Sequence, residues 1–214
     1  MFYKPMVKTF IITPGIFLGV LFSQTFSEST PVHTYSIVAF DEETGELGVA
    51  VQSHWFSVGF LVPWAKAGVG AVATQSFVKV DYGPEGLNRM ENGQSAEEAL
   101  NSLLAEDEGE AVRQVAMIDV KGSVAAHTGT KCIYAAGHQI GKNYSVQANL
   151  MEKETVWPSM ANAFERSNGD LAEKMMAALE AAEAEGGDIR GKQSAAMLIV
   201  SGNPTGIPWK DVVM

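Results

Sequence analysis

The chain has 214 residues, a formal net charge of −10 at pH 7 and 46% hydrophobic residues. This length suits one domain with a sizeable core, and an acidic balance without any basic block excludes nucleic acid as an expected partner. The single cysteine, Cys132, cannot form an internal disulfide, and we expect it to be a small buried residue rather than a nucleophile.

Residues 1–27 have the pattern of a secretory signal peptide. Lys4 and Lys8 precede an apolar run that ends at Phe22, and small or polar residues follow. The run is too short for a stable membrane anchor. We therefore predict an exported protein, periplasmic or extracellular, with a single domain over residues 28–214.

Residues 34–40 and 47–53 predict a β-hairpin. Both segments are rich in β-branched and apolar residues, and the short turn DEETG separates them. If they pair end to end, Thr34 lies opposite Ser53, and Ser36 follows on the same face. Three hydroxyl groups then gather at one end of an otherwise apolar ribbon.

A third strand is predicted over residues 68–77, after a loop that contains Lys66. If this strand is antiparallel to the second, its beginning lies at the hydroxyl end of the hairpin and brings Lys66 towards Thr34. A hydroxyl nucleophile needs a base and a nearby positive charge, so the pair fits an N-terminal-nucleophile (Ntn) hydrolase. The alternative is a solvated lysine beside ordinary strand hydroxyls.

The rest of the chain alternates between helix pairs and runs of strands. Ser95 and Glu98 have the spacing of a capping box, and Asp170 is the expected N-cap of the last helix. The predicted helices are 82–92, one that begins at Ser95, 155–167 and 170–185, and the predicted strands are 113–119, 123–128, 133–138, 144–150 and 194–201.

This order predicts an α+β fold. Runs of strands separated by helix pairs argue against a doubly wound parallel sheet and for antiparallel sheets covered by helices. We expect a four-layer αββα sandwich. In the last helix, Met175, Met176 and Leu179 lie on one predicted face, which we interpret as core rather than as a binding surface.

The recognisable motifs point away from cofactors. The GxGxxA match that begins at Gly68 lies in a predicted strand, whereas a dinucleotide site needs it at the start of a helix. His33, His54, His127 and His138 are not at the paired spacings of metal ligands, so a zinc site would require the fold to gather them. We predict no cofactor and no metal.

The loop after the last helix holds a compact set of donors. Arg190, Lys192, Gln193 and Ser194 come directly before the final strand and would suit a carboxylate or a developing oxyanion. The alternative is a surface ion pair between Asp188 and Arg190 of little consequence.

Six ordered blocks of this sequence resemble the DUF1028 family, which is placed in the Ntn-hydrolase superfamily and has no established substrate. The blocks are TYSIVAFDEETGELGVAVQSHWFSVG, VPWAKAGVGAVATQS, YGPEGL, AAHTGTKC, NYSVQANLM and GGDIRGKQSAAMLIVSG. The resemblance covers roughly residues 34–209 and implies the αββα sandwich.

The resemblance also implies roles for residues. An Ntn hydrolase uses the first residue of its mature chain as nucleophile and that residue's free amine as base. By analogy, Thr34 becomes the nucleophile, Lys66 the nearby cation and Ser53 a polar partner. The candidate binding residues, several of them possible oxyanion donors, are Gln52, Ser36, His127, Asn149, Arg190 and Gln193.

Two departures from the family qualify this hypothesis. Cleavage near Ser27 would leave about six residues ahead of Thr34, so a free amine on Thr34 needs further trimming or self-cleavage. Similar proteins usually continue beyond the segment that ends this chain, so we expect an unfinished sheet edge or a truncated sequence, and the edge suggests a homodimer.

Our leading hypothesis is hydrolysis of an amide bond in an envelope peptide or an acylated amino compound. The alternative is a non-catalytic scaffold that binds an envelope component or another small ligand in the same cleft.

Overall fold

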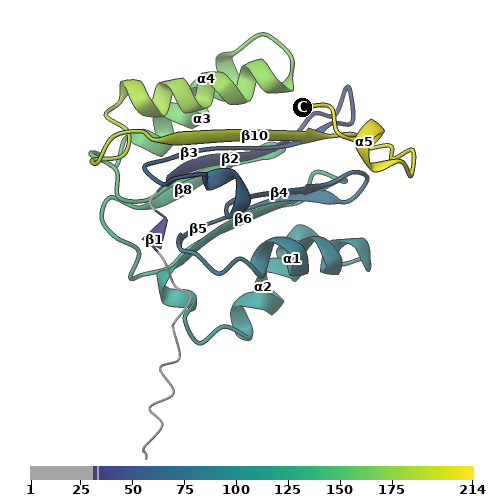
Figure 1. Cartoon of the computed structure of the whole chain (residues 1–214), viewed down its shortest axis with the longest axis horizontal. Coiled ribbons are helices and arrows are strands. Elements are labelled where there is room, and N and C mark those ends of the chain that lie inside the picture. The colour runs from purple at the N-terminus through teal and green to yellow at the C-terminus, as the bar shows by residue number, and fades with distance from the viewer. Residues whose placement is uncertain (1–30, 33) are drawn as a thin grey trace, which may run out of the picture.

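A computed structural model describes residues 31–32 and 34–214 (Figure 1). The predicted signal peptide, residues 1–27, lies outside the described residues. The strands are β1 Pro31–Val32, β2 Thr34–Phe40, β3 Leu47–Ser53, β4 Pro63–Lys66, β5 Gly70–Phe77, β6 Arg113–Asp119, β7 Val124–Thr128, β8 Gly137–Gly141, β9 Tyr144–Ala148 and β10 Ser194–Val200. The helices are α1 Tyr82–Glu91, α2 Ala96–Ala105, α3 Val156–Arg166, α4 Leu171–Ala184 and α5 Pro208–Asp211, with short 3-10 helices η1 Val58–Phe60 and η2 Glu110–Val112.

The strands form two antiparallel sheets stacked between two pairs of helices (Figure 1). One sheet, here the β2 sheet, has the order β10-β3-β2-β9-β8, and α3 and α4 cover it. The other, the β5 sheet, has the order β1-β5-β6-β7 with β4 also paired to β5, and α1 and α2 cover it. The predicted αββα sandwich is therefore confirmed.

Three apolar layers hold these four structural layers together. Side chains alternate along each strand, so the central strands contribute both to the layer between the sheets and to a layer beneath helices. The inner layer includes Val38, Val49, Val51, Ala71, Ala73 and Ile118. The two outer layers are built around Ile37, Val146, Met160 and Met175 on one side and around Val72, Met117, Leu100 and Leu87 on the other.

The predicted hairpin is confirmed in its register. Thr34 pairs with Ser53 and Phe40 with Leu47. Gly45 lies in the turn with a φ of 77°, a left-handed conformation that glycine adopts without strain. The three hydroxyl groups thus lie on the face of the ribbon that points between the sheets.

The predicted neighbour of β3 is wrong. We expected the strand that begins near Gly68 to pair with β3, but β10 pairs along the whole of β3 and β5 lies in the other sheet. The final strand, β10, is strongly apolar and forms the backbone hydrogen bonds along the free edge of β3. The β5 sheet therefore packs against the face of the β2 sheet rather than extending its edge. The loop expected around Lys66 is the short strand β4.

Two smaller predictions also need correction. The weak strand over 133–138 is displaced, because β8 covers Gly137–Gly141. Met176 is 47% exposed, so it does not belong to the core stripe that contains Met175 and Leu179.

Both predicted helix starts are confirmed. The Ser95 hydroxyl accepts a hydrogen bond from the Glu98 N–H, and the Glu98 carboxylate accepts one from the Ser95 N–H. Asp170 and Glu173 form the same reciprocal arrangement at α4. Each box pairs two of the backbone N–H groups that a helix end leaves free.

The last residues of the chain lie against the outer edge of β10. Val212 forms an antiparallel bridge with Val200, and the N–H of Ile199 donates to the carbonyl of Met214 at 2.8 Å. Part of the predicted open edge is therefore covered. Among the described helices, none combines the length and apolarity needed to cross a bilayer.

Gly83 fixes how closely α1 approaches β4. A β-carbon at this position would overlap the indole ring of Trp64. Alanine normally stabilises a helix relative to glycine by about 0.5–1 kcal/mol, but overpacking costs about 1–3 kcal/mol. We therefore expect Gly83→Ala to lower the free energy of unfolding, measured by urea denaturation. Exposed Glu85→Ala on the same helix is the control, and a stabilised Gly83→Ala protein would contradict this packing.

Candidate functional site

The candidate site lies between the sheets, at the end where β2 begins and β3 ends. Thr34 and Ser53 are both completely buried, and the Thr34 hydroxyl donates to the Ser53 hydroxyl at 3.2 Å. Ser194 lies opposite Ser53 on the next strand. Three hydroxyl-bearing residues therefore form one row across the β2 sheet.

Next to this row, polar side chains replace the apolar inner layer. The Ser36 hydroxyl donates to Gln75 Oε1 at 2.6 Å and accepts from Gln147 Nε2 at 2.6 Å. Ser145 in turn donates to Gln147 Oε1 at 3.0 Å. All four residues are buried, and a buried polar group is tolerated only when its hydrogen bonds are made.

The carbonyl of Thr34 is held by several donors. Asn149 donates to it from its backbone N–H at 3.0 Å and from Nδ2 at 3.4 Å. Gln75 Nε2 reaches it from the opposite sheet at 3.2 Å. These contacts fix the backbone at the start of β2, from the end of the neighbouring strand β9 and from β5 of the facing sheet.

Gln114 is the hub of the buried network. Its Oε1 accepts from Gln75 Nε2 at 2.7 Å and from Asn149 Nδ2 at 2.9 Å. Its Nε2 donates to the carbonyl of Ala148 at 2.9 Å and to the Thr128 hydroxyl at 2.9 Å. Because the carbonyl only accepts and the two partner amides donate, the orientation of the Gln114 amide is settled by its partners.

The chain changes sheets immediately before Thr34. Pro31 pairs with Phe77 and Val32 with Ser76, both in the β5 sheet, whereas Thr34 is the first residue of β2. The chain therefore passes from the β5 sheet to the β2 sheet between Val32 and Thr34.

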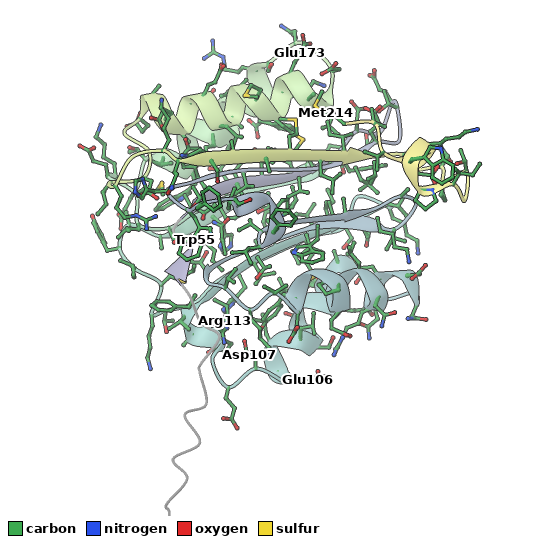
Figure 2. All side chains as sticks on the ribbon, in the orientation of Figure 1. Trp55, Glu106, Asp107, Arg113, Glu173 and Met214 are labelled. Carbon is green, nitrogen blue, oxygen red and sulfur yellow. The ribbon has the colours of Figure 1, made fainter. Side chains whose placement is uncertain are left out.

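A charged cluster supports this end of the β5 sheet from outside. Arg113 donates to the carbonyl of Phe77 at 2.6 Å and pairs with Asp107, whose Oδ2 is 2.9 Å from its Nε (Figure 2). Tyr82 also donates to Asp107, at 3.1 Å. Burial alone raises the pKa of Asp107, but the hydrogen bond and charge of Arg113 and the N–H of Gly109 outweigh it and lower the pKa to about 2.

Lys66 does not lie near Thr34, so this geometric prediction is wrong. Lys66 pairs with Gly70 at the beginning of β5, and its ammonium lies 2.6 Å from Glu91 at the surface. The part of β5 that contacts Thr34 is Gln75, five residues further along, or about 16 Å at 3.3 Å per residue. The error follows from assigning β5 to the wrong sheet.

Gln52 and His127 lie on the outer faces of their sheets. Gln52 pairs with Tyr35, whose side chain packs under α3 and α4. His127 pairs with Val115, which packs under the other helices, and its Nε2 lies 2.9 Å from the carbonyl of Glu110. Each is next in sequence to an inward-facing residue. Because side chains alternate between the two faces of a strand, Gln52 and His127 point away from Thr34.

The side chains of Arg190 and Gln193, in the loop before β10, are also separate from the cluster. Arg190 pairs with Asp188 at 2.6 Å, which is the alternative that the sequence left open. The side chain of Gln193 is exposed, although its N–H donates to the carbonyl of Ser53 at 3.1 Å. Of the predicted site residues, Thr34, Ser53, Ser36 and Asn149 are therefore the ones brought together.

Sequence reasoning missed the three glutamines and the threonine–histidine pair that complete the network. Gln75, Gln114 and Gln147 each interrupt an apolar strand at an inward position, which is a usable signal. Thr128 and His138 lie on edge strands of different sheets, with Oγ1 2.8 Å from Nδ1. Their proximity depends on how the sheets stack.

The part of the chain that the structure describes holds neither a cluster of three metal-ligating side chains nor an activated thiol. Among the described residues, no three histidine, cysteine or carboxylate side chains are placed to share a metal ion. Burial raises the pKa of the Cys132 thiol, and its sulfur lies 3.3 Å from the carbonyl of Arg113. A thiol in that state is a poor nucleophile.

Comparison with known proteins identifies one family. A family model described as "Family of unknown function (DUF1028)" matches residues 34–214. A crystal structure of a DUF1028 protein from Silicibacter pomeroyi is 32% identical, with a TM-score of 0.74 over 79% of this chain and 74% of that one. BPH of Thiobacillus denitrificans, solved with epoxomicin, is 12% identical with a TM-score of 0.44 over 80% of this chain and 100% of that one, a likeness that carries no argument. None of the curated proteins matches this chain.

The Asp107 cluster should make the protein sensitive to acid. A carboxyl whose pKa falls from 3.8 to about 2 on folding stabilises the protein above pH 4, and this contribution is lost as the pH falls towards 2. The loss should be about 2 kcal/mol. Urea denaturation between pH 5 and pH 2 measures it. Asp107→Asn should remove this part of the pH dependence, exposed Glu106→Gln should not, and equal slopes in all three proteins would contradict the assignment.

Replacing Gln114 should destabilise the protein more than replacing an exposed glutamine. Gln114→Leu keeps the volume but leaves one side-chain N–H of Gln75 and one of Asn149 without an acceptor, each at about 1–3 kcal/mol. We expect a loss of about 3 kcal/mol in the free energy of unfolding, measured in urea. Exposed Gln94→Leu serves as the control. Losses of similar size in both variants would show that the network contributes little.

Proposed function

Because the chain belongs to DUF1028, a family of unknown function, its activity has to be inferred from the site, and we propose that it is an Ntn-type amidohydrolase with Thr34 as nucleophile. The observation that carries the proposal is the position of Thr34. It is the first residue of an inner strand, its hydroxyl is hydrogen-bonded to Ser53, and the chain changes sheets between Val32 and Thr34.

A free amine on Thr34 would supply the base that a hydroxyl nucleophile needs. An α-amine has a pKa of about 7.7–8.0, so a useful fraction is neutral near pH 7 and can take the proton from Oγ1. The attack of Oγ1 on a substrate carbonyl then forms an acyl ester with Thr34, and the proton passes through the amine to the departing nitrogen. Water hydrolyses the ester in a second step.

A neutral donor takes the place that the sequence hypothesis gave to Lys66. We assign stabilisation of the oxyanion to the Ser53 hydroxyl, whose oxygen lies 3.2 Å from that of Thr34. Both protons of the Asn149 side-chain amide are donated to Gln114 Oε1 and to the Thr34 carbonyl, so we assign Asn149 the role of positioning the Thr34 backbone.

The same hydroxyl could release its own amine. Oγ1 would attack the carbonyl carbon of residue 33, the C–N bond to Thr34 would break, and the resulting ester would be hydrolysed by water. The nitrogen of Thr34 would gain a proton and become the free α-amine. This self-cleavage would explain how a chain with upstream residues acquires an N-terminal threonine.

We place the substrate outside the cytoplasm. The signal-like pattern of residues 1–27 supports export, and an amide in an envelope peptide or an acylated amino compound is the substrate class that fits this location and chemistry. A homodimer through the remaining edge of β10 is a further proposal. Sizing of the purified protein over a range of concentrations would test it.

One observation favours the rival function, a non-catalytic binding scaffold. A groove of about 370 Å³ between α4 and β10 is lined by Met176, Leu179 and Met197, and Gln52 lies beside it with both amide atoms buried and without a hydrogen-bond partner among the described residues. This groove is on the opposite face of the β2 sheet from Thr34. It could therefore bind a ligand without any reaction.

The mature N-terminus distinguishes the two functions. We expect intact mass and N-terminal sequencing of the exported wild-type protein to give a chain that begins at Thr34. Thr34→Ala should retain its upstream residues, Thr34→Ser should mature, and Ser53→Ala should mature at least ten-fold more slowly. Thr44→Ala, in the turn at the other end of the hairpin, is the control. A wild-type chain that begins near Glu28 would favour the scaffold.

A further inference from the structure

Thr128 and His138 close the open side of the inter-sheet space. β7 and β8 are the last strands of their sheets, and both residues face inwards, because Thr128 pairs with Gln114 and His138 pairs with Gln147. Oγ1 of Thr128 lies 2.8 Å from Nδ1 of His138. Both side chains are only partly buried, so a small molecule can reach them from this edge.

The direction of this hydrogen bond follows from counting protons. Gln114 Nε2 lies 2.9 Å from the Thr128 hydroxyl and, because an amide nitrogen only donates, it cannot receive the hydroxyl proton. The Gln114 amide cannot be flipped, since its Nε2 also faces the carbonyls of Ala148 and Gly137. Among the described residues, His138 Nδ1 is the acceptor that remains within reach of the hydroxyl proton.

His138 is in the state that can accept this proton. Burial, followed by the nearby charge of His127, lowers the pKa of His138, so the ring is neutral at pH 7. The carboxylate at this edge, Glu110, is engaged with His127 instead, at 3.2 Å from its Nε2. A neutral imidazole with Nδ1 free and a hydroxyl donating to it is the pairing of base and nucleophile used in acyl transfer.

We propose that Thr128 and His138 form a second reactive centre, an activated hydroxyl that accepts the acyl group of small activated esters. The inference is independent of the Thr34 proposal, because it needs neither a free N-terminus nor removal of the leader. It assigns to the pair a reaction that Thr34 would perform only after processing.

With an ester, Oγ1 of Thr128 forms a bond to the acyl carbon, the bond from that carbon to the alcohol oxygen breaks, and the alcohol leaves with the proton that His138 Nδ1 took from the hydroxyl. A fluorophosphonate probe reacts in the same sense. For the probe, Oγ1 of Thr128 forms a bond to phosphorus, the phosphorus–fluorine bond breaks and fluoride leaves. His138 Nδ1 takes the hydroxyl proton and passes it to the buffer. The stable phosphonate ester adds a fixed mass to the peptide that contains Thr128.

The test is site-resolved labelling of the full chain with a small alkyl fluorophosphonate, read by peptide mass spectrometry. We expect label on Thr128 in the wild type and in Thr34→Ala. His138→Gln should reduce the labelling rate at least ten-fold, Thr128→Val should abolish it, and Thr128→Ser should retain it. Thr130 is exposed and two residues away, so it reports the reactivity of an unactivated threonine in the same sample.

Thermal unfolding of each variant shows whether it is folded. Thr128→Val is nearly isosteric, and Thr128→Ser preserves the hydroxyl should the valine disturb the edge. Thr128 labelled no faster than Thr130, or at a rate unchanged by His138→Gln in a folded protein, would overturn the proposal. Either result would leave the maturation of Thr34 unaffected, so the two hypotheses fail separately.

Discussion

The requirement that buried polar groups be paired governs the end of the sandwich where the candidate site lies. Gln75, Gln114 and Gln147 come from three strands, and each amide is satisfied by donors and acceptors from more than one strand. Loss of one partner leaves several groups unpaired in a medium of low polarity. The stacking of the sheets, the start of β2 and the carbonyl of Thr34 are therefore fixed together.

The groups that face Thr34 within this network are uncharged hydroxyls and amides. The ions at the same end, Arg113 and Asp107, are paired on the outer face, where they support the backbone of β5 and β6. A neutral interior favours neutral substrates and neutral bases, because an unpaired ion would pay a large desolvation cost there. An α-amine near its pKa or an imidazole meets this condition, whereas the ammonium of Lys66 at the surface does not contribute.

Patterns within neighbouring segments were predictable from the sequence, whereas contacts between layers were not. The register of Thr34 with Ser53 follows from the length of the hairpin, and the helix starts follow from Ser95 and Asp170. The partner of β3 depends on competition between two apolar strands distant in sequence, and the wrong choice displaced Lys66. Gln52 and His127 were also misplaced by sequence reasoning. A shift of one residue along a strand moves a side chain to the other face of the sheet.

The crossing before Thr34 has a consequence for the fate of the leader. Pro31 and Val32 are paired to Phe77 and Ser76, so cutting the chain after residue 33 would leave the two new ends attached to different sheets. The severed peptide would remain paired to β5 until its two-residue ladder opened. Such a short ladder holds weakly, so release of the peptide would be a separate event that follows the cut.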